Sequence, residues 1–453
     1  MTSHAVPPKD PPAPSSPGRE GRDPGALAAG LEPVPGGTHP REVAALLGAL
    51  RGVVLGDDAR ILVPHSPDRS GTDVLTEVRG RLRRPVPGGT AVILQTSGST
   101  TGRGHLVALS ARSLAASARA TEQRLAGPGQ WLLAVPSHHV AGLQVLVRSA
   151  LAGTEPVVLD TTGGFDAESL AGAARTMRAD VPGYLSLVPT QLVRVLDAGD
   201  DAVAALRRLA AILVGGAASA LHTLGRARDA GLRVVTTYGM TETGGGCVYD
   251  GVPLPGVTVR TTDQRVEISG PVLASGYLDD PAADEAAFTT ADGVRWLRTS
   301  DRGRLEHSAP GQAARLVVLG RMDDLINTGG VKVSPGAVER VLHEHPGVGQ
   351  VVVVGVPDDE WGELVTAVLT VAPGAAAPAL AELRALVAAR LDSAQAPRAL
   401  VVVPRLAERG PGKVDRIASA RIAEAALREP HGSGVERHVH GAPPTADEGS
   451  RGR

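Results

Sequence analysis

Residues 91–105 read Ala-Val-Ile-Leu-Gln-Thr-Ser-Gly-Ser-Thr-Thr-Gly-Arg-Gly-His, an apolar run followed by hydroxyl-bearing residues and glycines. The run 91–94 predicts a short buried strand, and the polar part predicts a loop. Backbone N–H groups and hydroxyls in such a loop can surround phosphate oxygens, because glycine permits close approach of the backbone. A flexible surface loop is the alternative. The pattern differs from the G-x-x-x-x-G-K-[ST] phosphate loop, since no lysine follows its second glycine.

On both sides of this loop, short apolar runs alternate with stretches of helical spacing. The predicted strands are 131–135, 157–159, 184–188, 211–214 and 234–237, and the clearest helical stretches are 110–125 and 142–151. Such alternation favours parallel sheets that are covered by helices on both faces.

After Gly251 the pattern changes, because turns become frequent and strands with alternating polarity appear, as at 265–268 and 315–319. A further small unit of mixed helices and strands begins near Arg321. The predicted fold class is therefore α/β, with a large N-terminal domain of parallel α/β sheets plus a β-rich lobe, and a small α+β C-terminal domain.

A chain of 453 residues is too long for one ordinary core, so division into domains is expected. Residues 1–38 and 429–453 are rich in proline, glycine and polar residues and are predicted to be disordered tails. Between them we expect an N-terminal domain at 39–320 and a C-terminal domain at 321–428.

Charge and composition exclude several classes of protein. The formal net charge is −2, from 46 basic and 48 acidic residues, which argues against a nucleic-acid partner. Cys247 is the sole cysteine, and no apolar run approaches the ~20 residues that span a membrane. The first 20 residues have no apolar stretch typical of a signal peptide. We expect a soluble cytoplasmic protein without membrane insertion.

A second polar motif, Tyr238-Gly239-Met240-Thr241-Glu242-Thr243, follows the predicted strand 234–237. Ligands in open α/β sheets bind at the carboxyl ends of strands, where this motif lies. The carboxylate of Glu242 could hold Mg²⁺, which takes few protein ligands and leaves the others to phosphate and water. A plain turn is the alternative.

Three more motifs follow in the chain, each of which would be an ordinary turn or loop by itself. They are Thr299-Ser300-Asp301-Arg302-Gly303, then Gly320-Arg321-Met322-Asp323-Asp324-Leu325-Ile326 with Gly329-Gly330 shortly after, and Gly410-Pro411-Gly412-Lys413-Val414-Asp415-Arg416. Asp301 could accept hydrogen bonds from both hydroxyls of a ribose, or simply bond its own backbone.

In this order, the motifs resemble those of the adenylate-forming superfamily, which includes acyl-CoA synthetases, adenylation domains of peptide synthetases and beetle luciferases. The resemblance covers about residues 90–420. Its most specific segments are 238–243 and 320–330, and supporting matches lie at 188–190, 213–217, 270–271 and 276–278. It implies ATP, Mg²⁺ and coenzyme A as cofactor and co-substrates, and an AMP-forming acid–thiol ligase as the enzyme.

The resemblance implies that the first loop handles the β- and γ-phosphates of ATP. The residues concerned are Thr96, Ser97, Gly98, Ser99, Thr100 and Gly102. The family usually continues Gly-x-Pro-Lys, whereas this chain reads Gly102-Arg103-Gly104-His105, so the usual lysine is missing. Arg103, His105 or backbone N–H groups are the candidates to replace it.

The resemblance also implies the rest of the nucleotide site. Gly215, Gly216 and Ala217 would line the adenine and acyl pocket, Tyr238 would stack on adenine beside Gly239, Thr241 would contact the α-phosphate, Glu242 the Mg²⁺, and Asp301 the ribose, with Arg321 nearby.

The C-terminal domain is implied to be mobile and to serve two steps. Lys413 resembles the catalytic lysine that stabilises charge as pyrophosphate leaves. Rotation about a hinge at Asp323 would then withdraw Lys413 and bring Gly329-Gly330 to the site for thioester formation.

The segment 135–149 resembles the compact o-succinylbenzoate–CoA ligases of menaquinone biosynthesis, which names the acid. His139 would then close the acyl pocket, and Arg148 would pair with a substrate carboxylate, for which a guanidinium is suited. The alternatives are a histidine that bonds backbone and an arginine on a helix surface.

Three other functions stay open at this stage. One is another small acyl- or aryl-CoA ligase, the second is a stand-alone adenylation enzyme that loads a carrier protein, and the third is a degenerate binding protein. The sequence does not fix the oligomeric state, with a homodimer among the options.

Overall fold

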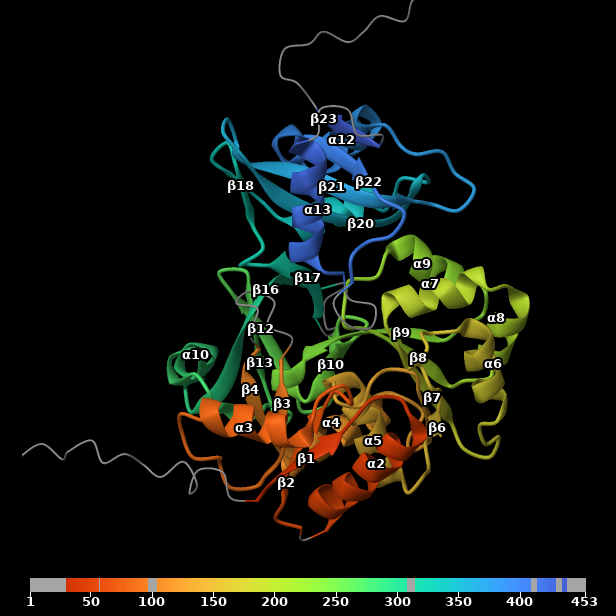
Figure 1. Ribbon diagram of the computed structural model, residues 1–453, viewed down its shortest axis with the longest axis vertical. Helices are drawn as coiled ribbons and strands as arrows, with labels where there is room; N and C mark the ends of the chain where they lie inside the picture. The colour runs from red at the N-terminus through yellow and green to blue at the C-terminus, as the bar shows by residue number, and fades with distance from the viewer. Residues whose placement is uncertain are drawn as a thin grey trace, which may run out of the picture.

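The structure, a computed structural model, describes residues 30–56, 58–96, 104–307, 314–408, 414–428 and 434–437. Several predicted site residues lie outside these ranges: Ser97, Gly98, Ser99, Thr100, Gly102 and Lys413. Figure 1 shows the chain as a large lower part that carries the first three sheets and a smaller upper part that carries the fourth.

The first sheet has the strand order β1-β2-β3-β4-β14. Its strands are β1 (Leu31–Pro35), β2 (Ile61–His65), β3 (Thr90–Gln95), β4 (Leu106–Ser110) and β14 (Gly276–Tyr277). The first three run parallel, and β4 and β14 are each antiparallel to their neighbour.

The second sheet has the order β11-β10-β9-β8-β7-β5-β6, and its strands from β5 to β9 pair in parallel. Its strands are β5 (Gln130–Leu133), β6 (Val157–Val158), β7 (Gly183–Leu187), β8 (Ala211–Val214), β9 (Val234–Met240), β10 (Gly245–Tyr249) and β11 (Val252–Pro253).

Helices cover both faces of each of these sheets, as the apolar runs predicted. Between the sheets lie α2 (Pro40–Leu55), α4 (Ala111–Arg124) and α5 (Val140–Ala152), which share one core with them. On the outer faces lie α3 (Gly71–Arg81), α6 (Ala167–Arg175), α7 (Pro189–Asp197), α8 (Asp200–Leu206) and α9 (Leu221–Asp229). In β3, Leu94 faces the shared core and Ile93 the outer one, because successive side chains of a strand point to opposite faces.

The third sheet is antiparallel, as the alternating polarity after Gly251 predicted. Its elements are β12 (Thr258–Thr262), β13 (Arg265–Ser269), β15 (Phe288–Ala291), β16 (Val294–Glu306) and β17 (Arg315–Arg321), with α10 (Pro281–Ala287) before β15.

The fourth sheet begins after β17 and has its own core. Its strands are β18 (Ile326–Thr328), β19 (Val331–Val333), β20 (Val348–Asp358), β21 (Gly362–Val371), β22 (Ala399–Val402) and β23 (Val435–Arg437), and its helices are α11 (Pro335–Leu342), α12 (Leu380–Arg390) and α13 (Arg416–Arg428). Sheet membership changes between Arg321 and Ile326, next to the predicted hinge. The α/β fold class with a β-rich lobe and a small α+β unit is confirmed, whereas the domain bounds and the hinge motion stay predictions.

The prediction of disorder was wrong for parts of both tails. β1 pairs in parallel with β2, and it buries Leu31 and Val34 although prolines flank Val34. At the other end, β23 pairs with β22. Both are edge strands. They are held by backbone hydrogen bonds to strands that are distant in sequence, which the apolar content of the segment itself does not reveal. Within the described ranges, no helix is both long and apolar enough to cross a membrane.

Candidate active site

The base of the predicted phosphate loop is closed by paired backbone segments. The N–H of Thr96 donates to the carbonyl oxygen of His105 at 2.9 Å, and the N–H of His105 donates to Thr96 Oγ1 at 2.8 Å. A Cβ atom at Gly104 would collide with the Thr96 carbonyl, so glycine is required there. The two ends of the loop, Thr96 after β3 and His105 before β4, therefore lie side by side; we call this pair of residues the neck of the loop.

The side chain of His105 is held at this neck by two partners. Its ring stacks on Tyr277 with the centroids 4.4 Å apart, and its Nδ1 lies 3.6 Å from Oδ1 of Asp279. Asp279 is also bound by Arg81 at 2.5 Å. The contact with Asp279 raises the pKa of His105 above its ordinary value, in spite of partial burial. The Asp279 contact thus stabilises the charged form of the His105 imidazole at the end of the predicted phosphate loop.

The carboxylate of Glu242 lies next to this cluster. Glu242 is in the 3₁₀ turn η1 (Thr241–Thr243), directly after β9. The hydroxyl of Tyr277 donates to its Oε1 at 2.7 Å, and its backbone oxygen accepts from the N–H of Ala274 at 2.8 Å. The side chain of Glu242 is half-buried, and the hydrogen bond to its Oε1 fixes its orientation.

A single carboxylate in this position fits the needs of Mg²⁺ at a nucleotide. No group of three or more histidine, cysteine, aspartate or glutamate residues that could hold a metal occurs in the described part of the chain. Mg²⁺ is usually held by one or two carboxylates together with phosphate and water, so a full protein cage is not needed. Glu242, next to the predicted phosphate loop, would provide such a carboxylate.

A second cluster joins β9 to the third sheet. The hydroxyl of Tyr238 donates to Oδ2 of Asp301 at 2.7 Å, and Arg321 lies opposite Asp301 in the pairing of β16 with β17. Burial raises the pKa of Asp301 above its ordinary value, although the Tyr238 hydroxyl and the Arg321 charge oppose this effect. Asp301 is therefore a half-buried carboxylate whose charged form is stabilised by the Tyr238 hydrogen bond.

The three residues predicted to line the adenine pocket follow β8, the neighbour of β9. A Cβ atom at Gly215 would collide with Oγ1 of Thr237, and Gly216 has a φ of +84°. Ala217 is exposed. On β9 itself, Gly239 has no room for a side chain against the backbone of Gly245. These glycines let backbone approach backbone at the carboxyl edge of the sheet.

The predicted hinge carries a network of ion pairs. Arg321 forms a two-pronged pair with Asp323, at 2.8 and 2.6 Å. Arg416 lies 3.5 Å from Asp324 and 2.6 Å from Glu339. Arg416 is the first residue of α13, so the start of this helix is tethered to the connection between β17 and β18.

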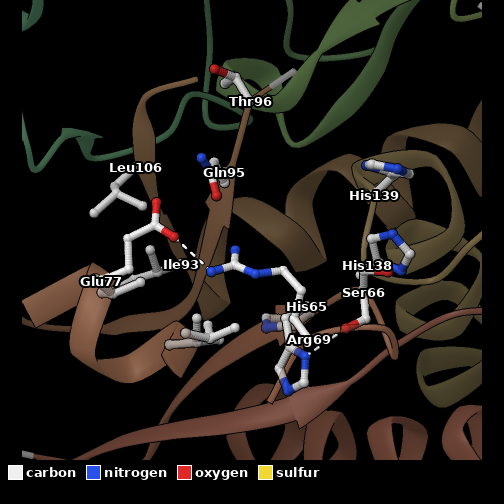
Figure 2. A pocket seen from close by; sticks show the side chains of 14 residues that line it. His65, Ser66, Arg69, Glu77, Ile93, Gln95, Thr96, Leu106, His138 and His139 are labelled. Carbon is white, nitrogen blue, oxygen red and sulfur yellow. Dashed lines mark hydrogen bonds and ion pairs between the residues drawn. The ribbon is translucent and has the colours of Figure 1, made fainter. Parts of the chain in front are cut away.

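A cavity of about 240 Å³ opens beside Thr96 and His139 (Figure 2). Figure 2 shows the side chain of Arg69 reaching to Glu77, with His138 and His139 on the side away from Glu77. The Arg69–Glu77 ion pair measures 2.7 Å. Burial, and then the neighbouring histidines, lower the pKa of His138 to about 3, so it is neutral. The structure thus places His139 at a cavity next to the phosphate loop.

Arg148 lies elsewhere. Its side chain is buried within α5, with the guanidinium carbon 4.8 Å from the ring centre of Trp131 and Nη2 3.4 Å from the Tyr249 hydroxyl. It is not among the residues that line the cavity beside His139. The structure therefore does not bring Arg148 together with the other predicted site residues.

Sequence reasoning missed three contributors to the site. Tyr277 lies in the Gly276-Tyr277-Leu278 match, which served only as support for the family, and Asp279 directly follows that match. Arg69 carries no motif. It reaches the cavity only because α3 follows β2 next to β3.

Comparison with known proteins agrees with this geometry. The sequence model of the AMP-binding enzyme family matches residues 42–278, and that of the AMP-binding enzyme C-terminal domain matches 337–413. A probable 2-succinylbenzoate–CoA ligase of Mycobacterium tuberculosis is 43% identical over 379 residues, which cover 83% of this chain and 95% of that protein. The 2-succinylbenzoate–CoA ligase of Escherichia coli is 33% identical over 53% of this chain and 49% of its own length.

Solved structures show the same fold. The o-succinylbenzoate CoA synthetase of Bacillus subtilis, in complex with its acyl-adenylate intermediate, aligns with a TM-score of 0.65 and 22% identity over 85% of this chain and 87% of that one. ATP-bound MatB of Rhodopseudomonas palustris aligns with a TM-score of 0.65 and 24% identity over 83% and 82%. The resemblance inferred from the motifs is confirmed, and the chain belongs to the family of AMP-binding enzymes.

Proposed function

We propose that this protein is an ATP-dependent 2-succinylbenzoate–CoA ligase that works through an acyl-adenylate. The observation that carries the proposal is the relative named for that activity, which is 43% identical and is covered over 95% of its length. The geometry supports it, because two hydrogen-bonded pairs, Glu242 with Tyr277 and Tyr238 with Asp301, connect the carboxyl end of β9 to the first and third sheets.

In the first step, a carboxylate oxygen of the acid attacks the α-phosphorus of ATP, and the bond to the β-phosphate oxygen breaks to release pyrophosphate. Asp301 would hold the ribose and Thr241 the α-phosphate. Lys413 would stabilise the charge that develops between the attacking carboxylate and the α-phosphate. Mg²⁺ at Glu242 would neutralise charge on the phosphates when it is bound.

In the second step, the thiol of coenzyme A attacks the acyl carbon, loses its proton, and displaces AMP. This step needs a different surface, which the Gly329-Gly330 turn would supply after rotation about Asp323. The network of Arg321, Asp323, Asp324 and Arg416 at that connection supports the placing of the hinge there.

The acid named by the relatives keeps a second carboxylate after adenylation, and a cation is needed to recognise it. Arg69 lines the cavity beside His139 and is partly exposed there, although it would share its charge with Glu77, whereas the buried Arg148 would have to leave its contacts with Trp131 and Tyr249. We therefore favour Arg69 over Arg148 as the carboxylate partner. We place the enzyme in the cytoplasm, where ATP and coenzyme A are available, and a homodimer stays a prediction.

The test is pyrophosphate release with ATP and Mg²⁺ against a panel of acids, with and without coenzyme A. The panel contains 2-succinylbenzoate, benzoate, hydroxybenzoates and medium-chain fatty acids. Release selective for 2-succinylbenzoate, with formation of its CoA thioester, is the expected result. Release with another acid would keep the mechanism and overturn the substrate. Adenylation without use of free coenzyme A would indicate an enzyme that loads a carrier protein.

A further inference from the structure

The Gly329-Gly330 turn connects β18 to β19 and has an unusual backbone. Gly329 has a φ of +55° and Gly330 a φ of +80°. Two successive positive φ values are typical of a two-residue hairpin turn of type I′, which glycine adopts without steric cost. The conformation of the turn is therefore set by its sequence, but its position is set by what packs against it.

One side of this turn rests on Trp361. The N–H of Gly329 donates to the carbonyl oxygen of Trp361 at 2.9 Å, and a Cβ atom at Gly329 would lie 2.8 Å from the indole ring. Trp361 is held in turn by Asp358, whose Oδ1 accepts from the N–H of Trp361 at 3.0 Å. Gly329 thus lies directly on the edge of the ring.

Arg398, the residue directly before β22, covers the indole ring of Trp361. Its guanidinium carbon lies 3.4 Å from the centre of the Trp361 ring, which is within the range of a cation–π contact. Its backbone N–H donates to the carbonyl oxygen of Val365 at 2.7 Å. Nε of Arg398 has no hydrogen-bond partner among the described residues, so the ring is a main contact of this group.

The opposite side of the turn is open. A Cβ atom at Gly330 would meet no atom within 4 Å, and Val331 and Lys332 are exposed. The turn is therefore supported from one side and free to receive a substrate on the other. This asymmetry is expected of a surface that must approach a second substrate without being displaced itself.

We propose that Trp361, backed by Arg398, is a positioning residue that holds the Gly329-Gly330 turn in place for thioester formation and has no part in adenylation. The proposal rests on the proposed function, since it assigns a role in the second step. The Trp361–Arg398 stack acts on the reaction only through the position of the turn. A shift of the turn by about 1 Å can lower the rate of thioester formation roughly 100-fold.

The experiment measures the two half-reactions separately on the full chain. Adenylation is followed by ATP–pyrophosphate exchange with 2-succinylbenzoate, and thioester formation by mixing the preformed acyl-adenylate with coenzyme A. In Trp361→Ala we expect thioester formation to fall about 10- to 100-fold, with exchange within about twofold of the wild type. Trp361→Phe keeps a ring beneath Gly329 and should recover most of the rate.

Arg398→Ala should lower only thioester formation, and Arg260→Ala is its matched control. Arg260 stacks on Trp296 at 3.8 Å in the third sheet and also pairs with the buried Glu267 at 2.7 Å, so its loss removes at least as much contact away from the turn. Equal loss of both half-reactions in Trp361→Ala, or no loss in either, would overturn the proposal. A wild-type protein that forms no CoA thioester would instead overturn the proposed function.

Discussion

The hydrogen bond from Tyr238 to Asp301 provides the sharpest test of the site. Tyr238→Phe removes one hydroxyl and leaves the half-buried ring, so the change is confined to a 2.7 Å contact with a half-buried carboxylate. Hydrogen bonds to charged groups are worth about 1.5–3 kcal/mol. We expect a loss of about 2 kcal/mol in the free energy of unfolding at pH 7.5, and a similar weakening of ATP binding, about 30-fold.

The sign of the pH dependence follows from the raised pKa of Asp301. A carboxyl group with a raised pKa in the folded state contributes stability at low pH, and this contribution is lost as the pH rises through the folded pKa. Loss of the Tyr238 hydroxyl raises that pKa further. The difference in stability between wild type and Tyr238→Phe should therefore grow with pH, from roughly 1 kcal/mol when Asp301 is protonated in both proteins.

The assay is denaturant unfolding from pH 5 to 8, together with the KM for ATP in pyrophosphate release. Asp301→Asn gives the control background for a double-mutant cycle, which isolates the energy of the pair. In that background Tyr238→Phe should cost much less than in the wild type. An equal cost in both backgrounds, or a difference that shrinks as the pH rises, would refute the reasoning.

Four further predictions concern single residues. Lys413→Ala should slow adenylation about 10²- to 10³-fold and spare thioester formation from the preformed acyl-adenylate, as measured by the two half-reaction assays. Glu242→Gln should raise the Mg²⁺ concentration needed for half-maximal pyrophosphate release, and unchanged Mg²⁺ dependence would exclude Glu242 as the ligand. His105→Ala should raise the KM for ATP while AMP binding, measured by calorimetry, stays the same. Arg69→Met should raise the KM for 2-succinylbenzoate more than that for benzoate, whereas Arg148→Met should lower the unfolding midpoint and leave this preference unchanged.

The local sequence was sufficient to predict most of the central strands and to recognise the family. The run at 91–94 and the other apolar runs became strands in sheets covered on both faces, because burial on both sides demands apolar residues at every position. The resemblance placed Gly215 and Gly239 in the nucleotide site, and the structure shows that neither position has room for a side chain.

Edges and partners of the sheets could not be predicted in the same way. β1 has few apolar residues, and it is ordered because β2, whose sequence lies 25 residues further on, offers it a hydrogen-bonding edge. The resemblance of 135–149 and the chemistry of its guanidinium suggested Arg148 as a substrate ligand, but its side chain packs against Trp131 in the core.

The sequence by itself determined which chemical groups this protein has: a loop of hydroxyls and glycines, Glu242 beside Thr241, Asp301, and a lysine near the end. Only the tertiary structure decided which of them act together. Tyr277 meets Glu242 across 35 residues of chain and Tyr238 meets Asp301 across 63. Such contacts depend on the order in which strands join their sheets, because each pairing is fixed by burial and backbone hydrogen bonds that no local segment contains.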